Sequence, residues 1–82
     1  MTIIVREGDL TVDAELSVVL QDRGYGWRSA IFDTRSREHL EQLVNRSMPL
    51  ETAELAARDG DAKTRVRLRE IQNERTTARR GR

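Results

Sequence analysis

The chain has 82 residues, with 15 basic and 14 acidic side chains and no cysteine. A chain of this length forms one domain with a thin hydrophobic core, and without cysteine it can hold neither disulfides nor thiolate metal sites. Its longest apolar runs have three residues, as at 3–5 and 18–20, and are far shorter than a signal-peptide core or a spanning helix. We therefore expect a cytoplasmic protein without a membrane partner.

The first 33 residues are expected to form a three-stranded antiparallel meander. Residues 2–6 are rich in β-branched side chains and end at a turn around Gly8. Residues 10–21 alternate apolar with polar side chains, which predicts one long strand with a buried face and a wet face. After a turn at residues 22–26, a third strand over residues 27–33 places Trp27, Ser29 and Ile31 on one face. The apolar row of the long strand is Leu10, Val12, Ala14, Leu16, Val18 and Leu20.

The remainder of the chain is expected to be helical. Capping side chains precede apolar residues at helical spacing, which predicts a helix over residues 37–47. Pro49 suits the first turn of a second helix, and Gly60 is expected to end it. A third helix is predicted from Asp61 to Arg75, a stretch without glycine or proline. Residues 76–82 have almost nothing to bury, so we expect a flexible basic tail.

These elements predict a single α+β domain over residues 1–75. The sheet would be a three-stranded antiparallel meander, covered by two or three helices on the face that carries Leu10, Leu16 and Leu20. The two layers depend on each other, because a lone meander would leave its apolar row in water.

The sequence offers no catalytic constellation. His39 is the single histidine, and neither a Ser-His-Asp nor a Cys-His pattern accompanies it. On the expected helix Glu38, His39 and Glu41 point in different directions, which makes a metal site geometrically poor. We therefore expect His39 on the surface, and a protein that is not an enzyme and takes no metal and no cofactor.

Residues 23–27, Arg-Gly-Tyr-Gly-Trp, resemble the start of the RNA-binding consensus of RNA-recognition motifs. The resemblance implies aromatic side chains that stack on bases and a basic residue that contacts the backbone. Arg28 and Ala30 depart from the pattern, since an aliphatic and an aromatic residue belong there. The alternative is a glycine-rich hairpin turn with Trp27 in the core.

A second stretch, residues 55–66, resembles a helix-turn-helix. Leu55-Ala56, Gly60 and Val66 have the offsets of that motif, which implies a turn at the glycine and a recognition helix after it. Asp59, Asp61 and Arg69 stand where apolar residues belong. An ordinary helical hairpin with the same turn chemistry is the alternative.

Charge is sorted along the chain, and this pattern carries the functional hypothesis. Residues 1–60 hold seven arginines and eleven acidic residues, whereas residues 61–82 hold eight basic and three acidic residues. Arginine pairs bidentately with phosphate or carboxylate, although a GC-rich coding bias would equally produce arginine-heavy usage. The leading hypothesis is a non-catalytic regulator that contacts DNA or RNA through an Arg-rich C-terminal helix and tail.

The alternative hypothesis is a protein-binding module, such as an inhibitor or antitoxin of phage or plasmid type or an assembly adaptor. Its partner would present an acidic surface, including the acidic part of a second subunit in a homodimer. The candidate contact residues for either hypothesis are Arg65, Arg67, Arg69, Arg75, Arg79 and Arg80 in the basic segment, with Arg23, Tyr25 and Arg28 from the glycine-rich segment.

Overall fold

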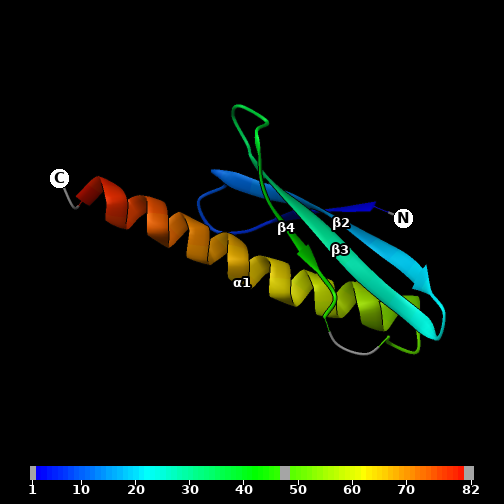
Figure 1. The fold of residues 1–82 in the computed structure, drawn as a ribbon. Coiled ribbons are helices and arrows are strands. Elements are labelled where there is room, and N and C mark those ends of the chain that lie inside the picture. Colours follow the sequence, from blue (N-terminus) through cyan, green and yellow to red (C-terminus); the bar gives the residue numbers. More distant parts are fainter. Residues whose placement is uncertain (1, 47–48, 81–82) are drawn as a thin grey trace.

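The computed structural model describes residues 2–46 and 49–80, except for the side chains of the last two. It is an α+β fold in which one long helix crosses one face of a four-stranded antiparallel sheet (Figure 1). The strands are β1 (Thr2–Arg6), β2 (Val12–Gln21), β3 (Gly24–Asp33) and β4 (His39–Val44), side by side in chain order, and the helix is α1 (Ala53–Arg80). The expected fold class is confirmed.

The three-stranded meander is confirmed as the first part of the sheet. Leu16 pairs with Ile3 on β1 and with Ser29 on β3, so it lies on the central strand pair. Gly8 turns the chain between β1 and β2 with a positive φ of 67°, a conformation that glycine adopts without strain. Trp27, Ser29 and Ile31 are buried on one face of β3, as the alternation predicted.

The ends of the predicted apolar row are not covered by the helix. Val12, Ala14 and Leu16 are fully buried, but Leu10 is 54% exposed and Leu20 is 78% exposed. Leu10 lies in the turn before β2. At its C-terminal end β2 extends past β1, because the last residue pair between the two strands is Thr2 with Ser17. The buried stripe therefore runs from Val12 to Leu16, and the end of β2 beyond Ser17, which pairs only with β3, leaves Leu20 exposed.

The prediction of a helix over residues 37–47 is wrong, because this segment forms β4. Leu43 pairs with Ser29 and faces α1, while Gln42 and Val44 turn the other way. The pairing satisfies backbone groups along β3 that a helix at this position would leave unpaired. The helical spacing of Leu40, Leu43 and Val44 is overridden by this long-range pairing.

Gly60 does not end a helix, and the predicted second and third helices are one. A Cβ atom added at Gly60 would lie 2.7 Å from Leu16 Cδ1 and 2.8 Å from the Trp27 ring, so the glycine allows α1 to pack closely on the sheet at this point. The helix starts where Leu55 N–H donates to Thr52 Oγ1 at 3.1 Å. With no turn at Gly60, the helix-turn-helix resemblance does not hold.

The helix also continues past Arg75 to Arg80, so residues 76–80 are helical, and residues 81 and 82 of the expected tail lie outside the described part. Among the residues described, no helix has the length and apolar composition needed to cross a membrane.

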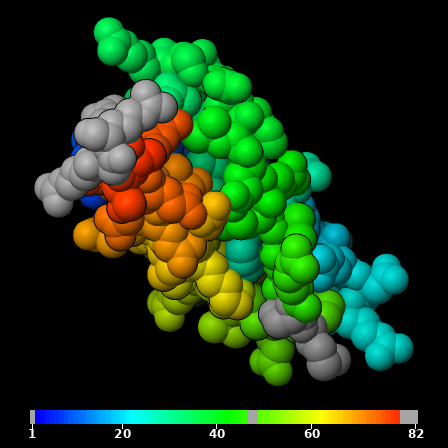
Figure 2. Space-filling model, turned by 60° about the vertical axis from the view of Figure 1, so that its left-hand side comes forward, coloured from blue at the N-terminus to red at the C-terminus, as the bar shows by residue number. Residues whose placement is uncertain are grey.

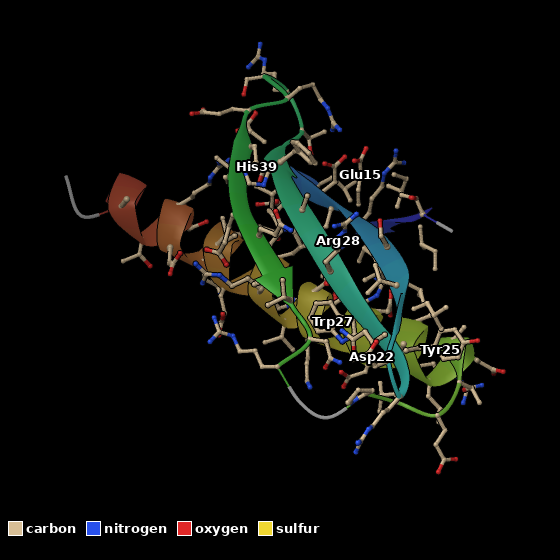
Figure 3. The ribbon with its side chains drawn as sticks, turned by 45° about the vertical axis from the view of Figure 1, so that its right-hand side comes forward. Glu15, Asp22, Tyr25, Trp27, Arg28 and His39 are labelled. Carbon is tan, nitrogen blue, oxygen red and sulfur yellow. The ribbon has the colours of Figure 1, made fainter. Side chains whose placement is uncertain are left out.

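Trp27 anchors the helix to the sheet. Its ring is buried beside α1 (Figure 3). Its Nε1–H donates to Asp59 Oδ2 at 2.8 Å. This bond, helped by Lys63, holds the pKa of Asp59 below its ordinary value. The buried apolar core is completed by Val5, Val12, Ala14, Leu16 and Ile31 from the sheet and by Ala56, Leu68 and Ile71 from α1.

Candidate functional site

Four of the arginines predicted to contact a partner, Arg65, Arg67, Arg69 and Arg75, lie beside carboxylates of the same chain. Arg67 forms a bidentate pair with Glu41 on β4, with N–O distances of 2.7 and 2.9 Å. Arg75 donates to Asp33 at the end of β3 at 3.0 Å. These contacts join the second half of the basic helix to the acidic sheet.

Arg65 and Arg69 complete this pattern near the turn between β1 and β2. Arg65 donates to Asp61 at 2.9 Å and to the carbonyl oxygen of Arg6 at 2.7 Å. Arg69 lies 3.6 Å from a carboxylate oxygen of Glu7, which Arg65 also approaches. The pairing with Asp61 raises the pKa of Arg65, so it stays charged.

The sorting of charge along the sequence therefore has a use inside the fold. An acidic sheet and a basic helix attract one another. The packing of α1 on the sheet brings arginines of the helix next to carboxylates that lie far away in the sequence. Paired carboxylates compensate much of the positive charge that would otherwise attract phosphate groups.

The pair between Arg75 and Asp33 should make the stability of the fold depend on pH in the acid range. The backbone N–H of Ser36 and the guanidinium of Arg75 lower the pKa of Asp33 to about 2. Because its folded pKa lies below the unfolded value of about 4, the stabilisation is complete above pH about 4 and is lost as the pH falls toward 2. We expect Asp33→Asn to flatten the dependence of unfolding free energy on pH in this window. Urea unfolding at several pH values measures it, and Asp22→Asn on the exposed β2–β3 turn should keep the wild-type profile.

The remaining predicted residues do not join those arginines in one patch. Arg23 is exposed on the turn between β2 and β3, and Arg28 is exposed on the sheet face away from α1 (Figure 3). Tyr25 is partly buried, and its backbone exchanges two 2.8 Å hydrogen bonds with Leu50. This turn lies beside the start of α1, far from its C-terminal end (Figure 1). Arg79 and Arg80 are the last residues of that helix, but their side chains lie outside the described part.

His39 is exposed, as expected, and its ring lies edge-on to Phe32 at 5.4 Å between centroids. In the described ranges no three side chains of the metal-binding types gather. The predictions that the protein is not an enzyme and takes no metal or cofactor stay predictions.

A groove with an apolar floor lies between β4 and α1. It has a volume of about 530 Å³. Trp27 and Leu43 lie at its floor, and Val66, which is 60% exposed, lies on the α1 side. Val44, whose side chain turns to the other face of the sheet, lines the groove at the edge of β4. Figure 2 shows β4 in green beside the yellow and orange turns of α1. The groove is also lined by Gln42, Arg46, Lys63, Arg67 and Glu70.

The outer edge of β4 leaves backbone groups available. Asn45 N–H donates to Trp27 C=O at 2.9 Å, and Leu43 pairs with Ser29 in the same ladder. Because bonded positions alternate along an antiparallel pair, the N–H and C=O groups of Gln42 and Val44 point away from β3. In the described sheet no further strand follows β4, so this edge can accept one.

The two ends of the groove differ in charge. At one end the Arg67–Glu41 pair bridges α1 and β4, with Glu70 and Glu74 at 3.3 and 3.5 Å from Arg67. The other end has Arg46, which is exposed and has no ion-pair partner among the described residues, and Lys63, which shares Asp59 with Trp27. One end is therefore acidic in sum and the other is basic.

Sequence reasoning missed this groove, because it assigned residues 37–47 to a helix and so removed the strand edge. One signal was present in the run Arg65-Val66-Arg67-Leu68. Residues two positions apart point to nearly opposite sides of a helix, so a helix that buries Leu68 must expose Val66. Comparison of the chain with protein-family models, with curated proteins and with solved structures found no match.

Proposed function

We propose that this chain is a non-catalytic protein-binding module that takes an extended segment of its partner along β4, in the groove beside α1. The observation that carries this proposal is a free strand edge next to exposed apolar side chains. Such a combination supports binding by strand addition, in which backbone hydrogen bonds give affinity and side-chain pockets give specificity.

The backbone of β4 supplies the first part of the interface. Gln42 and Val44 each direct one donor and one acceptor outward, so an added strand gains a short ladder without any change in the sheet. Exposed edges of this kind pair readily with another chain.

The side chains supply the second part. An added strand would alternate its side chains between the two sheet faces, and those on the α1 face would meet Leu43 and Val66. The groove volume of about 530 Å³ lies within the range of about 300–1,000 Å³ typical of binding pockets. Covering Val66 removes apolar surface from water, which favours association.

Nucleic-acid binding through the basic helix stays a prediction, and the internal pairing of Arg65, Arg67, Arg69 and Arg75 makes it the second candidate. It predicts strongly salt-dependent affinity for duplex or single-stranded oligonucleotides. Fluorescence anisotropy at two salt concentrations measures this directly, and salt-sensitive binding that leaves the amide signals of β4 unshifted would favour it over our proposal.

Val66→Asp should weaken peptide binding by about ten-fold or more, because it replaces an apolar contact by a charge that must be desolvated. The probe is a displayed library of random peptides of about ten residues, selected on the wild-type protein. Leu55→Asp is the matched control, since Leu55 is also an exposed apolar residue of α1 but does not line the groove.

Selected peptides should shift the amide NMR signals of Gln42 and Val44. The proposal fails if the library yields no specific peptide, or if the selected peptides bind both variants with wild-type affinity.

A further inference from the structure

We infer that β4 pairs antiparallel with β4 of a second copy of this chain, which makes the groove half of a two-fold symmetric interface. This inference rests on the proposed function, because it names the partner of the same surface. It follows from the self-complementarity of the edge in hydrogen bonding and in charge.

The hydrogen-bonding argument concerns register. If Leu43 lies opposite Leu43 of the second copy, then Gln42 of each copy lies opposite Val44 of the other. These are the two residues whose N–H and C=O groups point away from β3. In this symmetric arrangement the outward N–H and C=O groups of Gln42 and Val44 on each copy form hydrogen bonds with those of the other copy. The same residues are used on both copies, as an isologous interface requires.

The charge argument concerns direction. Antiparallel pairing reverses β4, so the acidic end of one copy meets the basic end of the other. Glu41 of one copy comes opposite Asn45 of the other, next to Arg46, which has no ion-pair partner among the residues described. Opposite charges on neighbouring strands stabilise pairing and fix register.

Two common devices that keep strand edges apart, proline and lysine, are absent from β4. The last residue of β4, Val44, is 48% exposed. A small domain with a thin core also gains stability from association. The bulge at Ile31 and Phe32 disturbs the ladder near His39, which limits the pairing to the part of β4 that carries Gln42 and Val44.

Analytical ultracentrifugation of the full chain from about 1 µM to about 500 µM tests the inference, since dimerisation depends on concentration. We expect a monomer–dimer equilibrium. Gln42→Pro should give a monomer at every concentration, because the ring replaces an N–H that points away from β3 and blocks the edge. Circular dichroism should show an unchanged sheet and helix content.

Arg46→Glu provides a second variant that does not touch the backbone ladder. It places like charges together at both ends of the interface, so the dimer dissociation constant should rise by about ten-fold or more. Arg35→Glu is the matched control, because Arg35 is exposed and lies on the connection between β3 and β4, away from the groove. Its dissociation constant should equal that of the wild type.

The outcomes separate the inference from the proposed function. A wild-type chain that stays monomeric while its groove still binds selected peptides would overturn the inference and leave the proposed function standing. A monomer whose groove binds no peptide would overturn both. A dimer with wild-type affinity in both Gln42→Pro and Arg46→Glu would place the interface elsewhere and overturn the inference alone.

Discussion

Leu16→Asp should abolish cooperative folding or lower the free energy of unfolding by about 4 kcal/mol or more. Leu16 is fully buried on the central strand pair, beneath the point where Gly60 brings α1 onto the sheet. A carboxylate there loses its hydration, and the single hydroxyl of the cross-strand Ser29 cannot replace it, so the group must either stay charged at high cost or take up a proton.

Leu20→Asp is the control for this experiment. Leu20 lies on the same strand with the same alternation, but it is 78% exposed, so its substitution should change the unfolding free energy by less than about 0.5 kcal/mol. Urea unfolding followed by circular dichroism compares the two variants. Equal stability of both would show that α1 does not cover the middle of β2.

Gly60→Leu should destabilise the fold by about 3 kcal/mol, even though leucine is a better helix former than glycine by roughly 0.8–1 kcal/mol. The first side-chain atom already meets Leu16 and the Trp27 ring at 2.7–2.8 Å, and both neighbours are held in the core. The helix can make room only by lifting from the sheet, which would lengthen the bond between Trp27 and Asp59.

Ala62→Leu tests whether that loss comes from packing. Ala62 is exposed two residues further along α1, so a leucine there meets no core atom and should leave stability within about 0.5 kcal/mol of the wild type. Thermal unfolding, together with the tryptophan fluorescence of Trp27, reports both stability and the environment of the ring. A Gly60→Leu variant as stable as Ala62→Leu would mean that α1 is not seated on Gly60.

Gly60 illustrates why helix boundaries were hard to predict. Glycine after a run of helix formers is a common helix end, and the aspartates on both sides suit a turn. In the fold Asp59 instead accepts a hydrogen bond from Trp27, 32 residues away, and Asp61 pairs with Arg65 one turn further on. The sequence pattern is the same for a helix end and for a close helix–sheet contact, and a distant tryptophan decides between them.

At the candidate site too, the sequence pattern is local but the contacts that decide its role are distant. Its cations were recognised from composition, but their partners were not, since Arg67 meets Glu41 across 26 residues and Arg75 meets Asp33 across 42. An arginine that is destined for an internal carboxylate has the same local sequence as one destined for an external partner. The assignment therefore needed the arrangement of α1 on the sheet.

The sequence by itself determined the strands of β2 and β3 and the burial of Leu16, Trp27 and Ile31, because alternation with a period of two is a local signal that survives in any context with one wet face. Only the tertiary structure decided that residues 39–44 form an edge strand and that α1 is continuous. Both depend on free energy gained from residues distant in sequence, which pair with a strand edge or pack beside a glycine. The groove exists because the edge strand β4 and the continuous helix α1 lie beside each other.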